Sequence, residues 1–218
     1  MVSVIRMLTE GDAKDMWAAI VDRKDALQSA LGKKGRLLYL TKRADFNEAS
    51  LFVHANDSNS VSELAIGYLA KIEGVSAVST MNLYRPRFFP VPEDTSDLKR
   101  FVVAIKAEPS CFSEVHKQLI NPNMPDGLRK VYYAFTLQHA EDDLHCSLLA
   151  EDEDRVQEYV DRHITTMNGI VSTEIHVIEK TKPFISYHEW LSYVAENNSM
   201  PAWHRYMENH FESSFQLQ

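Results

Sequence analysis

The sequence predicts an α+β protein of two tandem ferredoxin-like βαββαβ repeats, packed sheet to sheet as a dimeric α/β-barrel-like unit and followed by C-terminal helices. Three observations lead to this prediction: an internal repeat, helix and strand patterns in the order βαββαβ within each copy, and strands with apolar side chains on both faces. The 218 residues, 44% hydrophobic and 25% charged, are enough for two packed cores.

The repeat is clearest in two helical segments, 61–74 and 156–169, which align without gaps at a spacing of 95 residues. Ser60 and Asp154 suit the N-cap position of these helices, and a glycine ends each segment in a way typical of a helix C terminus. Apolar residues, with one histidine, recur with the period of an amphipathic helix in both copies: Val61, Leu64, Ala65, Tyr68, Leu69 and Ile72, then Val156, Tyr159, Val160, His163, Ile164 and Met167.

Strands are predicted on both sides of these helices. A strand rich in Val, Ile and Thr follows each helix, two apolar runs precede it as a hairpin, and a further strand and helix lie upstream. Both faces of the strands carry apolar side chains, so the sheet face away from the helices should also be buried. The predicted strands are 2–8, 36–41, 49–55 and 75–84 in the first copy, and 101–107, 131–137, 144–149 and 170–180 in the second.

These patterns divide the chain into a first repeat over 1–90, a Pro-containing linker over 91–98, a second repeat over 99–184 and a helical tail over 185–218. The tail contains two runs with helical spacing, and their aromatic faces are expected to cover a sheet edge or a neighbouring chain. The runs are Tyr187, Trp190, Leu191 and Val194, then Trp203, Tyr206, Met207, His210 and Phe211.

Composition excludes several classes of function. The chain has 23 Lys and Arg against 31 Asp and Glu, a formal charge of −8, which disfavours direct nucleic-acid binding. It has no apolar run of membrane-spanning length and no signal peptide pattern, so we expect a cytoplasmic protein without membrane contact. Cys111 and Cys146 form neither a disulfide framework nor a metal motif.

Motifs of nucleophilic catalysis, phosphate binding and zinc binding are absent, so no catalytic residue, metal ligand or cofactor is assigned. Two histidines leave an alternative open. His145 and His176 alternate with apolar neighbours along predicted strands, and if their sheet face lines a barrel, either is placed to act as an axial ligand or a general base. His163 is expected to be a core histidine.

Three segments, 100–109, 136–143 and 167–178, resemble the effector-binding (RAM-type) domain of the Lrp/AsnC family of transcriptional regulators. The resemblance covers roughly 2–90 and 99–184 and implies a βαββαβ dimeric α/β barrel. Two departures are notable: no helix-turn-helix domain precedes the first repeat, and two barrel halves are fused in one chain.

The resemblance also implies a ligand site near the hairpin between the second and third strands of each repeat. On the family's pattern, Asp143 and Glu141 would bind an ammonium group, Glu48 is the counterpart in the first copy, and Thr80 and Thr173 supply hydroxyl groups. Neither copy keeps the glycine of the family's turn.

The main functional prediction is therefore a non-enzymatic, homo-oligomeric regulatory or sensor protein. It would bind a small-molecule effector, such as an amino acid, and have no DNA-binding domain of its own. The alternative is a dimeric α/β-barrel enzyme or haem-binding protein of monooxygenase-like or dismutase-like type. A third possibility is a structural partner protein whose aromatic tail docks on another chain.

Overall fold

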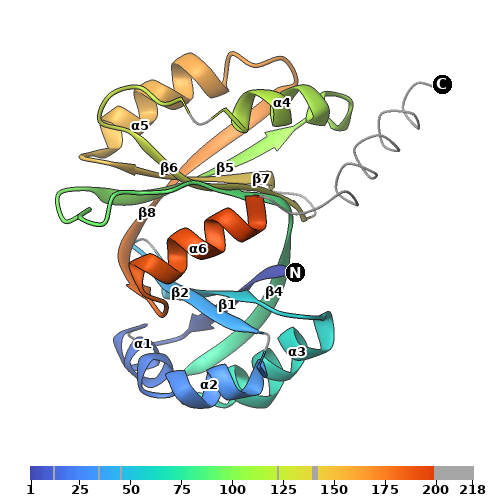
Figure 1. Ribbon diagram of the computed structural model, residues 1–218, viewed down its shortest axis with the longest axis vertical. Helices are drawn as coiled ribbons and strands as arrows, with labels where there is room; N and C mark the ends of the chain where they lie inside the picture. Colours follow the sequence, from blue (N-terminus) through green and yellow to red (C-terminus); the bar gives the residue numbers. More distant parts are fainter. Residues whose placement is uncertain (12, 34, 45, 122, 139–141, 199–218) are drawn as a thin grey trace.

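The computed structural model describes residues 1–198 except 12, 34, 45, 122 and 139–141. Its strands are β1 (Val2–Thr9), β2 (Arg36–Arg43), β3 (Glu48–His54), β4 (Val75–Phe88), β5 (Lys99–Ala107), β6 (Arg129–Gln138), β7 (Asp142–Ala150) and β8 (Ile170–Pro183). They form one closed antiparallel barrel in the order β1-β3-β2-β8-β5-β7-β6-β4 (Figure 1).

The prediction of two ferredoxin-like repeats packed sheet to sheet is wrong in its architecture. The two sets of four strands are not separate sheets, because β2 pairs with β8 and β4 pairs with β6. The reason is strand length: β4 and β8 each have 14 residues, so each pairs with strands of its own half and continues into the other half. Hydrogen bonds at these two seams close the eight strands into one barrel.

The helices lie outside this barrel in two layers, with one helix between them (Figure 1). The helices α1, α2 and α3 cover the half made by β1 to β4, and α4 and α5 cover the other half; α6 lies between the layers. Their bounds are α1 (Ala13–Asp22), α2 (Lys24–Ala30), α3 (Ser58–Ser62), α4 (Phe112–Leu119), α5 (Glu153–Tyr159) and α6 (Tyr187–Asn198). No helix of the described residues is long and apolar enough to cross a membrane.

The two helices of the internal repeat continue beyond their α-helical turns. After α3 the chain forms a π-helical segment (Glu63–Tyr68) and a 3₁₀ turn (Leu69–Lys71), and after α5 a π-helical segment (Val160–Ile164). Gly74 and Gly169 end the two segments with φ of +84° and +82°, which confirms the predicted left-handed positions.

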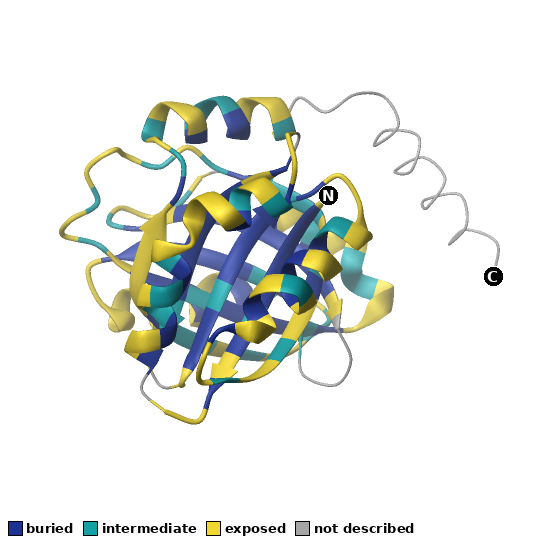
Figure 2. Cartoon of the chain, turned by 90° about the horizontal axis from the view of Figure 1, so that it is seen from below, coloured by how far each residue is buried: buried dark blue, intermediate teal, exposed yellow. Residues whose placement is uncertain are grey.

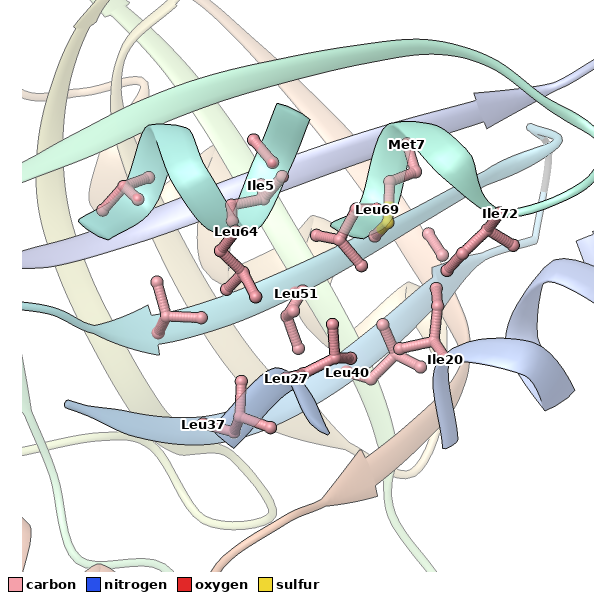
Figure 3. Close-up of a cluster of buried hydrophobic side chains, with 14 of the residues drawn as sticks. Ile5, Met7, Ile20, Leu27, Leu37, Leu40, Leu51, Leu64, Leu69 and Ile72 are labelled. Carbon is pink, nitrogen blue, oxygen red and sulfur yellow. The ribbon is translucent and has the colours of Figure 1, made fainter. Parts of the chain in front are cut away.

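Alternation along the strands separates an outer core from an inner core. On β1, Ile5 and Met7 point outward and pack with Leu51, Leu64 and other residues beneath α1 to α3 (Figure 3). An equivalent outer core lies beneath α4 and α5. Figure 2 shows this arrangement as buried strands surrounded by helices whose outer faces are exposed.

The inner core is apolar at the end of the barrel that α6 covers. Trp190 of α6 packs edge-on against Phe88 and Tyr39, with ring centroids 5.5 and 6.2 Å away. The hydroxyl oxygen of Tyr193, on the same helix, lies 3.1 Å from Nδ1 of His54. The aromatic face of α6 therefore closes one end of the barrel.

Candidate functional site

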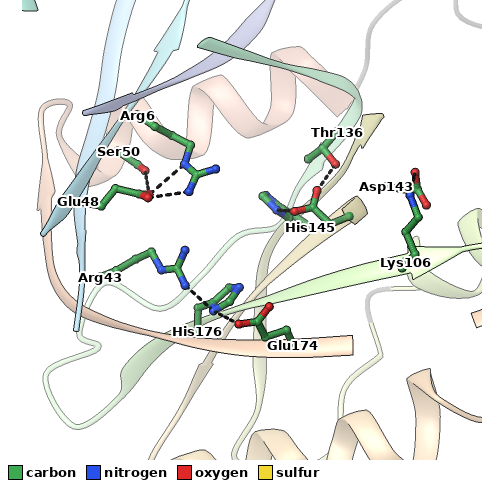
Figure 4. Close-up of polar contacts among 11 residues, drawn as sticks. Arg6, Arg43, Glu48, Ser50, Lys106, Thr136, Asp143, His145, Glu174 and His176 are labelled. Carbon is green, nitrogen blue, oxygen red and sulfur yellow. Dashed lines mark hydrogen bonds and ion pairs between the residues drawn. The ribbon is translucent and has the colours of Figure 1, made fainter. Parts of the chain in front are cut away.

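Polar side chains replace apolar ones inside the barrel toward the end away from α6. On β1, the inward positions are Val2 and Val4, which belong to the inner core, followed by Arg6. Val2 pairs with His54, the residue that contacts α6, whereas Arg6 pairs with Ser50 further along the barrel. We call this region the polar end. Its side chains come from both halves and point toward one another (Figure 4); those labelled there are Arg6, Arg43, Glu48, Ser50, Thr136, His145, Glu174 and His176. Asp142 belongs to the same region through its contacts with Thr136 and His145.

The first cluster of the polar end is an ion pair between β1 and β3. Arg6 donates from Nε to Oε1 of Glu48 over 3.1 Å and from Nη2 to Oε2 over 2.6 Å. The Ser50 hydroxyl donates to the same carboxylate over 3.2 Å. The Glu48 side chain is only 3% exposed, while that of Arg6 is 37% exposed. Glu48 is thus a buried anchor that holds a partly accessible guanidinium group.

The second cluster is a histidine–carboxylate pair on β7. His145 Nε2 lies 3.2 Å from Oδ2 of Asp142, and the hydroxyl of Thr136 on β6 donates to Oδ1 over 2.7 Å. Burial raises the pKa of Asp142, but the hydrogen bonds from His145 and Thr136 and the nearby charges outweigh it, so the pKa lies below its ordinary value of 3.8. Asp142 is therefore ionised at neutral pH and accepts a hydrogen bond from the N–H group at Nε2 of His145.

That arrangement fixes the tautomer of His145. With Nε2 carrying the proton, Nδ1 holds the lone pair of the neutral ring. Nδ1 has no hydrogen-bond partner among the described residues, and 14% of the side chain is exposed. His145 can therefore accept a proton from a bound molecule, and ionised Asp142 can stabilise the imidazolium that results.

The third cluster is formed by His176 of β8 and Arg43 of β2. Arg43 Nη2 lies 2.7 Å from His176 Nδ1, and Glu174 Oε1 lies 3.5 Å from the same nitrogen. Burial lowers the pKa of His176 and the charge of Arg43 lowers it further, against the raising effect of Glu174. His176 is therefore neutral at neutral pH and accepts a hydrogen bond from Arg43.

The register of β5 explains why the two histidines share one wall. Ala104 pairs with His145 on one side and with Glu174 on the other, and Val102 pairs with Ser147 and His176. All of these positions face inward, because the alternate residues of β5 belong to the outer core. Small side chains on β5 thus stand between the functional groups of β7 and β8.

Arg100 adds a buried guanidinium group to the barrel interior, without an ion pair among the described residues. It is 9% exposed, its Nε donates to Ser147 over 3.0 Å, and its Cζ lies 4.3 Å from the centroid of the Tyr39 ring. Its Nη2 has no hydrogen-bond partner among the described residues. Burial raises the pKa of Tyr39 to about 12, so that side chain is neutral and does not balance the guanidinium.

The described residues of the polar end do not form a site for a metal or haem. The described residues contain no group of three or more His, Cys, Asp or Glu side chains that could hold a metal ion. A single axial histidine is no better supported, because His176 bonds to a guanidinium group and His145 is turned toward Asp142. The next layer of the interior is filled by Phe52 and Tyr132, whose rings are in edge contact.

Two of the carboxylates predicted to bind a ligand already have partners within the chain. Asp143 lies away from the polar end, where it accepts hydrogen bonds from Lys106 Nζ and from the backbone nitrogen of Ala107, both over 3.2 Å (Figure 4). Glu48 belongs to the polar end and binds Arg6. Amino-acid binding by Asp143 or Glu48 stays a prediction.

Two further predicted residues, Thr80 and Thr173, are not brought together with Glu48. Thr80 pairs with Ile5 and Thr173 pairs with Ile105, two residues whose side chains point outward into the outer cores. Thr80 and Thr173 thus share the outer side of the wall, while Glu48 faces the interior. Glu141 lies outside the described residues.

Three arginines of the site, Arg6, Arg43 and Arg100, were not predicted as site residues from the sequence. Each lies at an inward position of a strand that also carries apolar side chains on that face, and its role becomes clear only once the face is known to line a barrel. His145 and His176 were predicted to share a face, as the structure shows.

Comparison with solved structures identifies proteins of the same fold. A monooxygenase-like protein from Lactobacillus acidophilus aligns over 84% of this chain and 95% of its own, with a TM-score of 0.54 and 10% identity. Chlorite dismutase from Candidatus Nitrospira defluvii aligns over 89% and 95%, with a TM-score of 0.50 and 11% identity. An anthrone oxidase-like protein aligns over 84% and 92%, with a TM-score of 0.51 and 10% identity.

These comparisons correct the predicted relationship. The similar structures are monooxygenase-like, chlorite dismutase and anthrone oxidase-like proteins rather than Lrp/AsnC effector-binding domains, so the prediction of a transcriptional regulator is not supported. The three segments that resemble Lrp/AsnC domains were misleading, because their motifs are degenerate and do not specify a functional site. No family model and no curated protein matches the sequence. The chain has the fold of the monooxygenase-like and dismutase-like barrels, as the alternative interpretation of the sequence stated.

Proposed function

We propose that this chain is a monooxygenase-like enzyme that removes a proton from a small organic substrate at the polar end of its barrel. The observation that carries the proposal is the His145–Asp142 pair, in which an ionised carboxylate orients a histidine whose second nitrogen is unoccupied among the described residues. The fold shared with monooxygenase-like and anthrone oxidase-like proteins supports it.

In this mechanism His145 is the general base. Nδ1 accepts the substrate proton, and the hydrogen bond from Nε2 to Asp142 stabilises the positive ring, as in other histidine–carboxylate pairs. His176 does not serve this role, because its Nδ1 already accepts from Arg43.

The arginines of the polar end stabilise the negative charge that the proton leaves behind. Removal of a proton next to a carbonyl group places charge on the carbonyl oxygen, and fixed cations near that oxygen lower the barrier. Arg6 is held by Glu48 and Arg43 is held at His176, so both guanidinium groups are oriented before substrate arrives. Arg100, buried deeper, adds to the positive potential.

This chemistry suits a ketone with an acidic C–H group, and the fold shared with an anthrone oxidase-like protein makes anthrone the probe to use. His145 takes one methylene proton, and the electron pair left on carbon reduces dioxygen. Overall, anthrone and O₂ give anthraquinone and water: one oxygen atom becomes the new carbonyl group and the other leaves as water. Dioxygen is the oxidant, so no metal or organic cofactor enters the balance.

Oxygen uptake with anthrone tests the proposal. The wild-type chain should consume dioxygen and form anthraquinone faster than buffer, and His145→Gln should reduce the rate by roughly 10²-fold or more. His188→Gln, on the exposed surface of α6, is the matched control and should keep the wild-type rate. Uptake no faster than in buffer, or an unchanged rate in His145→Gln, would contradict the proposal.

A further inference from the structure

A groove on the outside of the molecule, far from the polar end, is left without an occupant in the described part of the chain. Two hollows of about 520 and 290 Å³ share Phe89 and Pro90, so they form one continuous depression. We call it the Phe89 groove. The first hollow is further lined by Met124 and Leu128, and the second by Arg87, Ile120 and Asn198.

The surface of the Phe89 groove is suited to an apolar segment. Phe89, Ile120 and Met124 are only partly buried, although each is a large apolar side chain. Hydrogen bonds hold the backbone here. Phe89 N donates to Val131 O over 2.9 Å, and the Lys130 ammonium group, 5.3 Å from the Phe89 ring, donates to the carbonyl groups of Leu119 and Asn121 at the end of α4. The groove is therefore a preformed surface.

The described chain ends inside this groove. Asn198, the last residue of α6, donates from Nδ2 to Phe88 O over 2.7 Å, and its own carbonyl oxygen accepts from Arg87 Nη1 over 3.3 Å. Twenty residues follow, and Trp203 is only five residues further on, a span of at most roughly 18 Å. The first aromatic residue of the following segment can therefore reach the groove that Asn198 lines.

The sequence of this segment complements the groove. Trp203, Met207 and Phe211 recur at i, i+4 and i+8, which predicts one apolar stripe if the segment is helical, about 12 Å long. Residues 199–218 contain two glutamates and one arginine, whereas Arg87, Arg129 and Lys130 lie along the groove. Apolar pattern, charge and position all match the same surface.

We propose that the Phe89 groove binds the C-terminal segment of its own chain through Trp203, Met207 and Phe211. This inference is independent of the proposed enzymatic function, because the groove shares no residue with the polar end. It assigns the segment to the outside of the barrel, at a surface that shares no residue with the polar end.

Hydrogen exchange of the full-length chain tests the inference. Trp203→Ser with Phe211→Ser should speed amide exchange in 89–91 and 123–131 by about fivefold or more, because those amides lose their cover. Arg205→Ser with Asn209→Ser, on the opposite side of the predicted helix and without loss of a glutamate, is the matched control and should exchange like wild type. Equal exchange in all three proteins would overturn the proposal.

A reciprocal change in the groove identifies the occupant. Met124→Lys should speed trypsin cleavage after Arg205, because a charged groove no longer holds the segment. Unchanged cleavage would contradict the proposal. Wild-type protection that disappears on dilution, together with a dimer in sedimentation, would instead assign the groove to the tail of a second copy and overturn binding within one chain.

Discussion

Asp142 is the residue whose charge state determines what His145 can do. Its carboxylate accepts from Thr136 and from His145 and stays ionised at neutral pH. Asp142→Asn keeps the shape but presents an amide that can donate to Nε2, which favours the wrong tautomer of the histidine.

Activity toward anthrone should therefore fall by roughly 10²- to 10⁴-fold in Asp142→Asn, with little change in melting temperature. Steady-state oxygen uptake and a thermal melt of the same sample measure both quantities. Asp161→Asn, on the surface of the second repeat helix, is the control. An Asp142→Asn variant as active as wild type would exclude Asp142 from the mechanism.

The lowered pKa of His176 predicts how the free energy of unfolding depends on pH. Burial and the charge of Arg43 hold its pKa in the folded state below the ordinary 6.5, so the unfolded chain binds a proton first as the pH falls. The free energy of unfolding should thus decrease from about pH 6.5 to pH 5. His54, whose pKa burial also lowers, acts in the same direction.

Thermal melts of wild type, His176→Gln and His176→Gln with His54→Gln measure this effect. The first substitution should make the decrease smaller and the double substitution should make it smaller still. Asp142 does not interfere in this range, because its contribution is lost only below its ordinary pKa of 3.8. A pH dependence identical in all three proteins would contradict the account of these histidines.

Among the elements, the two repeat helices begin earlier than the sequence predicts. Their N-caps are Asp57 and Asp152, whose carboxylates accept from the backbone nitrogens of Ser60 and Arg155, and not Ser60 and Asp154. The sequence does not identify the N-cap uniquely, because several neighbouring Asp, Asn and Ser residues all suit that position. The 95-residue spacing of the repeat holds for the true caps as well.

Asp152→Ala should lower the free energy of unfolding by about 1 kcal/mol through loss of this cap, which corresponds to about 2 to 4 °C in melting temperature for a chain of this size. Asp154→Ala, two positions later, should have a smaller effect. A denaturant titration of both variants distinguishes them, and a larger loss in Asp154→Ala would show that the cap is misassigned.

Sequence periodicity identifies elements but not their partners. Strands and repeat helices were predictable because apolar residues recur at fixed spacing, and so was the shared face of His145 and His176. The pairing of β2 with β8 was not, because hydrogen-bonded neighbours leave no periodic trace. Arg6 and Arg43 were not predicted as site residues for the same reason. Their role in the site depends on which strands face each other across the barrel.

At the scale of the whole molecule, closure of the barrel creates the site. Arg6, Arg43 and Glu48 belong to the first half of the chain, and His145 and His176 belong to the second. The two halves are joined by hydrogen-bonded seams at β2–β8 and β4–β6 and by the shared inner core. The covalent connection over 91–98 is therefore not what holds them together.

A site-specific protease sequence introduced into 91–98 tests this. After cleavage the two fragments should co-elute in gel filtration and keep the wild-type melting profile, because the seams and the core remain. The same sequence placed after residue 198 serves as the cleavage control. Elution as two separate folded fragments would contradict closure of one barrel.

The central claim, that His145 removes a carbon-bound proton, is tested most directly without dioxygen. In deuterated buffer under anaerobic conditions, the wild-type chain should catalyse exchange of the anthrone methylene protons, followed by NMR, because proton removal precedes oxidation. His145→Gln should abolish the catalysis and His188→Gln should not. Exchange no faster than in buffer, or equally fast in His145→Gln, would contradict the claim.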